Sequence, residues 1–95
     1  MSEAVERLRK QVIEKALHGP GTTSGDARRA AFDNQDAGPL VDKVAKTAWK
    51  VTDEDIAAAK QSGLSEDAIF ELVVCAALGH STRQLDAALA ALEQA

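Results

Sequence analysis

Few side chains in this 95-residue chain could carry chemistry, and most of them lie between positions 71 and 84. Cys75 is the only cysteine, and its thiolate could act as a nucleophile. The surrounding sequence, Val-Val-Cys-Ala-Ala, is apolar, and such surroundings raise a thiol pKa instead of lowering it. Free cysteine is also among the most buried residue types. We therefore favour an inert core Cys75 over a reactive thiol.

Glu71 and His80 are the acid–base candidates on either side of Cys75. Glu71 lies one helical turn before the cysteine, on the same face, but its negative charge would disfavour the thiolate. We expect Glu71 to form a structural pair with Arg83 or with a lysine of a neighbouring helix. His80 lies about 140° around a helix from Cys75, so the two residues do not share a face. The pattern therefore disfavours general-base duty for Glu71 and a Cys–His pair.

A second candidate site is a polar cluster of His80, Arg83 and Gln84, which have helical spacings of three and four residues. Such a cluster could bind an anion, although we favour a structural role at a subunit junction. A metal site needs three or four convergent ligands, and His18, His80 and Cys75 do not have that spacing. We predict neither a metal nor another cofactor.

Helix signals cover most of the chain and would position these residues. We predict helices over 2–17, 26–33, 39–50, 52–62 and 66–93, with breaks near 18–24, 34–38, 50–52 and 63–65. Residues 68–78 are apolar nearly all round, which is typical of a buried helix. No strand pattern is present. The predicted fold class is all-α, a bundle of five to six helices with a long buried C-terminal helix.

The length predicts a single domain. Residues 1–38 would form N-terminal helices with a flexible connection, His-Gly-Pro-Gly-Thr-Thr-Ser-Gly, and residues 39–95 would form the helical core. A net charge of −4 gives no electrostatic reason to expect nucleic acid or an anionic membrane as a partner. Without an apolar run of about 18 residues or a signal-peptide pattern, and with one cysteine, we expect a cytoplasmic protein.

The apolar composition predicts self-association. Many apolar residues are alanines, which bury little area, and only Phe32, Trp49 and Phe70 are aromatic. A single chain of this size has little material to cover a long apolar helix. We therefore expect a homo-oligomer, a dimer or trimer, formed through the apolar faces of the 66–93 helix. Trp49 would be a core or interface anchor.

Part of the sequence resembles a known family. The segments Val-Thr-Asp-Glu-Asp-Ile (51–56), Ser-Gly-Leu-Ser-Glu-Asp-Ala-Ile-Phe-Glu (62–71) and Ala-Ala-Leu (76–78), together with Arg83, carry the resemblance. They are similar to the C-terminal half of the alkylhydroperoxidase D-like (AhpD-like) branch of the carboxymuconolactone decarboxylase family. The similarity covers 40–92. It implies an AhpD-like helical bundle and a tendency to oligomerise.

The peroxidase reaction of that family depends on a Cys-x-x-Cys pair followed by histidine. This chain has no cysteine before position 75, so the resemblance supplies no catalytic residues. Our main hypothesis is an AhpD-like protein without thiol peroxidase chemistry, which acts through an oligomeric surface or a small-molecule pocket. One alternative is a one-cysteine antioxidant or acyl-transfer enzyme that uses Cys75 with His80. Another is an accessory subunit of a larger assembly.

Overall fold

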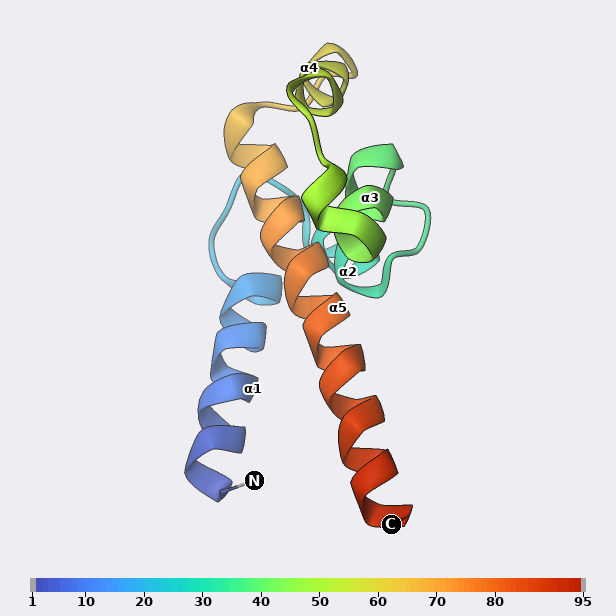
Figure 1. Cartoon of the computed structure of the whole chain (residues 1–95). Coiled ribbons are helices and arrows are strands. Elements are labelled where there is room, and N and C mark those ends of the chain that lie inside the picture. Colours follow the sequence, from blue (N-terminus) through green and yellow to red (C-terminus); the bar gives the residue numbers. More distant parts are fainter. Residues whose placement is uncertain (1, 95) are drawn as a thin grey trace.

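The computed structural model describes residues 2–94, which form five α-helices and one short 3-10 helix without any strand (Figure 1). The elements are α1 (Glu3–His18), α2 (Gly25–Asp33), α3 (Pro39–Thr47), η1 (Ala48–Lys50), α4 (Asp53–Gln61) and α5 (Glu66–Gln94). The all-α prediction is confirmed, and the breaks between helices lie close to the predicted ones, except that α3 ends at Thr47 and η1 takes the place of the last residues of the predicted 39–50 helix.

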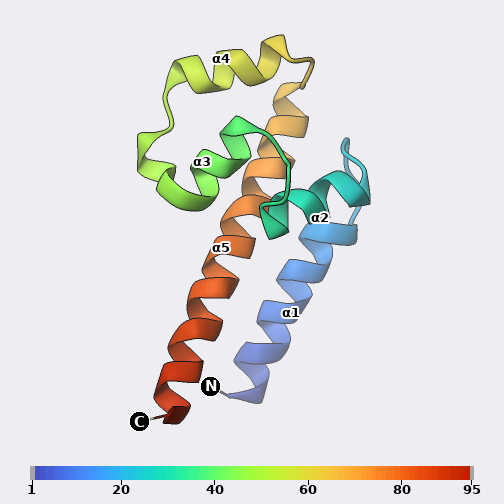
Figure 2. The same ribbon diagram turned by 90° about the vertical axis from the view of Figure 1, so that its right-hand side faces the viewer.

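α5 runs the length of the molecule, and the other helices pack around it (Figure 1). α1 runs antiparallel to α5 beside its C-terminal half, whereas α2 and α3 pack against its N-terminal half. Figure 2 shows α4 crossing the end of the molecule at which α5 begins. The molecule is elongated, with extents of 47 × 28 × 19 Å.

Hydroxyl side chains fix where the helices begin. Ser2 accepts a hydrogen bond from the Val5 amide, and Ser24 accepts one from the Ala27 amide. At α4, the Thr52 hydroxyl accepts from the Asp55 amide while the Asp55 carboxylate accepts from the Thr52 amide, which is a complete capping box. These bonds satisfy amides that have no partner within their own helix.

The core lies where the first half of α5 meets the end of α1 and the inner faces of α2 and α3. Its buried members come from all four helices: Leu17, Ala31, Val41, Val44, Leu72, Cys75 and Ala76. Most of these side chains are small, so close approach of the helix backbones supplies much of the packing.

α5 is not buried all round, which corrects one prediction. The apolar run from 68 to 78 predicted a helix surrounded by protein, but Phe70 is 70% exposed and Leu78 is only half-buried. Trp49 is 78% exposed and therefore does not anchor the core. The short helices α2, α3 and α4 pack against one side of α5, and its opposite side is exposed to solvent.

Candidate functional site

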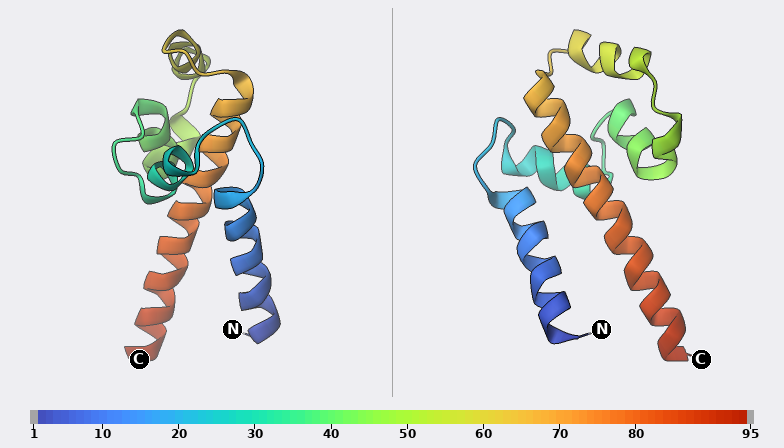
Figure 3. Two further views of the ribbon diagram at one scale, coloured as in Figure 1. Left: turned by 180° about the vertical axis from the view of Figure 1, so that it is seen from behind. Right: turned by 60° about the vertical axis from the view of Figure 1, so that its left-hand side comes forward.

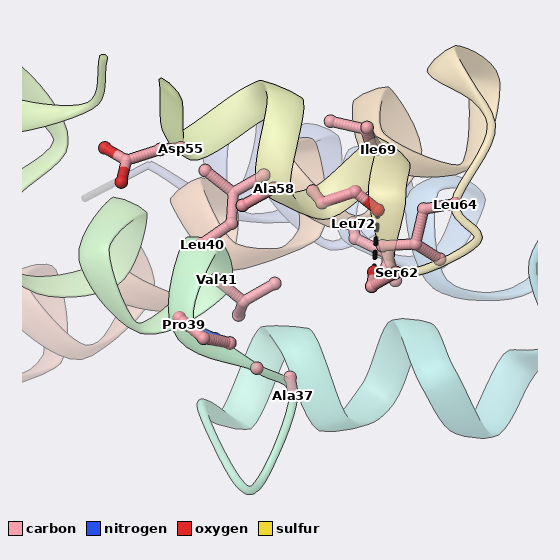
Figure 4. A pocket seen from close by; sticks show the side chains of 12 residues that line it. Ala37, Pro39, Leu40, Val41, Asp55, Ala58, Ser62, Leu64, Ile69 and Leu72 are labelled. Atoms are coloured by element: carbon pink, nitrogen blue, oxygen red, sulfur yellow. Dashed lines mark hydrogen bonds between the residues drawn. The ribbon is translucent and has the colours of Figure 1, made fainter. Parts of the chain in front are cut away.

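An apolar pocket lies between α3, α4 and the start of α5 (Figure 4). Its volume is about 230 Å³. Aliphatic side chains form most of its wall: Leu40, Val41, Ala58, Leu64, Ile69 and Leu72. Pockets of this kind, mostly apolar with few polar groups, are the usual form of small-molecule sites.

The local sequence explains why a space remains beneath α4. This helix presents Ala58 and Ala59 toward the pocket, and alanine side chains end at Cβ. On the other side, Gly38 adopts a φ of +100° and directs the chain into α3, whose first residue is Pro39. The small side chains of α4 leave the space between α3 and α4 unfilled.

The polar groups at the pocket are already paired within the protein. The Asp55 carboxylate accepts hydrogen bonds from the Lys43 ammonium at 2.7 Å and from the Thr52 amide at 2.9 Å. The Lys43 bond is the main reason that the pKa of Asp55 lies below its ordinary value. The Ser62 hydroxyl donates to the Ala59 carbonyl at 2.6 Å (Figure 4). Both bonds of Asp55 reach its Oδ2 atom, so the pocket offers mainly apolar contact beside a carboxylate that is held in an ion pair.

Cys75 lies in the core and not in the pocket. Its side chain is 1% exposed, and its thiol donates to the Ala16 carbonyl oxygen at 3.6 Å. Burial raises its pKa above the ordinary thiol value, although the positive charge of Arg28 opposes that shift. The thiol is protonated at neutral pH and screened from any substrate.

The partner of Glu71 differs from the one we expected. Its carboxylate does not contact Arg83; it accepts bonds from the Thr22 amide at 2.7 Å, the Thr23 amide at 2.9 Å and the Thr23 hydroxyl at 2.6 Å. These bonds lower the pKa of Glu71 to about 2, and the bond from the Thr22 amide makes the largest contribution. Gly21 lies against the same carboxylate. Glu71 thus anchors the connection that the sequence predicted to be flexible.

The proposed cluster of His80, Arg83 and Gln84 does not form. Arg83 points to α2 instead, where its guanidinium donates to the Phe32 carbonyl at 2.7 Å. His80 is half-buried and Gln84 is exposed, and no hydrogen bond joins the three among residues 2–94. Arg83 supplies a donor to a carbonyl in the last turn of α2, where helix carbonyls lack internal partners.

Arg28 is a structural residue that our sequence reasoning missed. It is 8% exposed, and its guanidinium donates to three carbonyls: Ala16 at 3.2 Å, Gly19 at 2.7 Å and Thr23 at 3.2 Å. It therefore joins the end of α1 to the loop before α2. The available signal was a long cation among the alanines of a short helix, but a solvent-exposed arginine gives the same pattern.

Between positions 2 and 94, no group of three or more His, Cys, Asp or Glu side chains could hold a metal ion. Within the same range, no helix is long and apolar enough to cross a membrane.

Comparisons of the chain with models of protein families, with curated proteins and with solved structures found no match.

Proposed function

We propose that this chain is an AhpD-like helical protein without thiol peroxidase chemistry, which binds a small apolar molecule beneath α4 and works as a homo-oligomer. The pocket between α3, α4 and α5 is the observation that carries this proposal. Its aliphatic lining favours an apolar ligand, because a charged one would lose its hydration without gaining a free partner.

The volume sets the size of the ligand. An apolar cavity of about 150 Å³ in a protein interior can bind benzene, and this pocket holds about 230 Å³. A single aromatic ring with short substituents, or a short branched alkyl group, would fit. Asp55 and Ser62 line the pocket wall, but they bond to Lys43 and Ala59. We therefore expect them to limit the size of the ligand and not to bind its polar groups.

The state of Cys75 supports a non-redox role. A thiol peroxidase needs an accessible thiolate, and a dithiol mechanism needs a second cysteine. Cys75 is 1% exposed, its pKa is raised by burial, and the sequence holds no other cysteine. His80, the base in the alternative one-cysteine hypothesis, makes no hydrogen bond to it in the described part of the chain.

Titration with toluene tests the pocket. Methyl resonances of Leu40, Ile69 and Leu72 should shift saturably in NMR spectra of the native protein. Ala58→Phe should abolish these shifts, because the ring occupies the pocket. Ala57→Phe is the matched control: it adds the same ring to an exposed neighbouring position that does not line the pocket, and binding should persist.

Two results would contradict the binding proposal. One is an absence of saturable shifts in the native protein. The other is equal toluene binding by the Ala58→Phe and Ala57→Phe variants, provided that far-ultraviolet circular dichroism shows both to be folded.

A further inference from the structure

A cleft separates α1 from the second half of α5, and it is lined mostly by apolar side chains. Both views in Figure 3 show the two helices extending side by side from the core. The cleft has a volume of about 540 Å³. Its apolar lining comes from both helices: Val5, Leu8, Val12, Ile13, Leu78 and Leu85. In the single chain, Leu8 is 62% exposed and Val5 is 53% exposed, so neighbouring apolar side chains remain in water.

The surface of the chain is too large for a compact monomer of this mass. A monomeric protein of 10.0 kDa is expected to expose about 5,200 Å². This chain exposes 6489 Å², an excess of about 1,300 Å². Its radius of gyration is 14.5 Å, whereas about 12.4 Å is expected for 95 residues. A stable protein–protein interface buries about 800 Å² of each partner. The excess exposed surface of this chain is therefore large enough to form such an interface.

One charged side chain in the cleft has only part of its hydrogen-bonding capacity satisfied. Arg9 lines the cleft and pairs with Glu6 through Nη2 at 2.6 Å. Its Nε and Nη1 atoms are buried and have no partner among residues 2–94. Buried guanidinium N–H groups ordinarily find an acceptor, because leaving them unpaired costs free energy. These two atoms are already buried within one chain, so the apolar side chains of the cleft, and not Arg9, decide what can fill it.

The two helices that form the cleft carry charges that suit each other across copies. α1 contains four basic residues and three glutamates, whereas residues 84–94 of α5 contain Asp86 and Glu93 and no basic residue. Two copies packed with their cleft helices antiparallel would set α1 of one, which has one more basic than acidic residue, against the end of α5 of the other, which has two acidic residues. The same contact would bring leucines and valines into both clefts.

We propose that a second copy of this chain fills the cleft, so that α1 and the second half of α5 from each copy form a four-helix bundle. This inference rests on the homo-oligomer of the proposed function and names its surface. The arrangement is self-complementary, as in a two-fold interface.

Light scattering on the full chain and on two variants tests the inference. The native protein should have at least twice the 10.0 kDa mass of one chain, and Leu8→Glu should reduce it to the single-chain mass. Leu8 is exposed in one chain, so the charge should leave the fold intact. Phe70→Glu is the matched control, because Phe70 is 70% exposed but lies away from the cleft. It should leave the oligomer unchanged.

A labelling experiment covers the case in which Leu8→Glu fails to fold. In Leu8→Cys, the new thiol should react with a maleimide slowly at micromolar concentrations and faster on dilution, whereas Trp49→Cys should react fast throughout. Buried Cys75 should stay unreactive in both variants.

A native protein of single-chain mass would overturn the inference. An oligomer that survives Leu8→Glu but dissociates in Phe70→Glu would also overturn it, while leaving the proposed homo-oligomer in place. Toluene binding is measured on different variants, so its failure can be distinguished from a failure of the cleft.

Discussion

The two halves of α5 belong to one helix, but they differ in how apolar they are and in what covers them. The buried residues of α5 are Ala68, Ile69, Leu72, Cys75, Ala76 and Gly79. From position 80 to 94, within the described range, none is buried, and Leu92 is 71% exposed. The helices α2, α3 and α4 cover the first half, whereas the second half has α1 beside it and reaches α2 through Arg83 (Figure 1). The apolar periodicity of a helix therefore predicts which of its faces can be buried. Whether that face is buried within one chain depends on the helices that pack beside it.

The largest expected effect is at Gly79, where the covered half of α5 ends. A Cβ at this position would collide with the Phe32 carbonyl of α2. Gly79→Leu should therefore separate α2 from α5 and reduce the free energy of unfolding by about 4 kcal/mol or more, as measured by urea denaturation. Gly25→Ala, where a Cβ meets no atom within 4 Å, should be neutral or slightly stabilising. Equal losses in both variants would contradict the close approach of α2 and α5.

A pair of leucine truncations compares the two halves directly. Leu72→Ala should cost about 3 kcal/mol, because Leu72 is 8% exposed and packs in the core. Leu92→Ala should change the stability by less than about 0.5 kcal/mol, because its side chain is exposed in the second half. Chemical denaturation of both variants measures the difference. A large loss in Leu92→Ala would mean that the end of α5 is covered after all.

Arg28 tests how the first half is joined to α1. Arg28→Met keeps the length of the side chain but removes the donors to the Ala16, Gly19 and Thr23 carbonyls. We expect a loss of about 2 kcal/mol in the free energy of unfolding. Arg29→Met is the control, since the Arg29 side chain is exposed, pairs with Asp33 at the surface and lies over the Phe32 ring, contacts that contribute little when exposed, so it should have a small effect. Similar losses in the two variants would argue against the role of Arg28.

The lowered pKa of Glu71 predicts that the stability of the protein depends on pH. Its pKa falls from 4.5 to about 2 on folding, because the Thr22 and Thr23 groups donate hydrogen bonds to the carboxylate. A lowered folded-state pKa gives a stabilisation that is complete above pH 4.5 and is lost as the pH falls toward 2. In Glu71→Gln, the urea midpoint should be lower at pH 7 and fall less steeply between these values. A slope identical to that of the native protein would show that another group controls acid unfolding.

The smallest expected effect is at Cys75. We expect no hydroperoxide turnover with a dithiol reductant in either the native protein or Cys75→Ser, because the thiol is buried and protonated. The substitution should cost about 1 kcal/mol, since a hydroxyl can keep the bond to the Ala16 carbonyl in an apolar site. Toluene binding should be unchanged. Turnover that disappears in Cys75→Ser would instead support the one-cysteine enzyme.

Much of the secondary structure could be predicted from local sequence. Ser2, Thr52 and Ser65 marked the starts of helices, because hydroxyl caps act on amides three residues away, and Gly63 marked an end with its φ of +108°. The pocket could not be predicted in this way. Its wall combines Leu40, Ala58 and Leu72 from three helices, and no spacing along the chain reports how far apart those helices lie.

The sequence by itself determined the fold class, the helix boundaries and the absence of a cysteine pair, because each depends on residue type or on contacts within a few positions. Only the tertiary structure decided which side chains act together. In the folded chain, Glu71 accepts hydrogen bonds from Thr22 and Thr23 and not from Arg83. Arg83 donates to the Phe32 carbonyl, and Phe70 is exposed. These outcomes depend on helix packing, and a pairing across about 50 residues leaves no periodic trace in the chain.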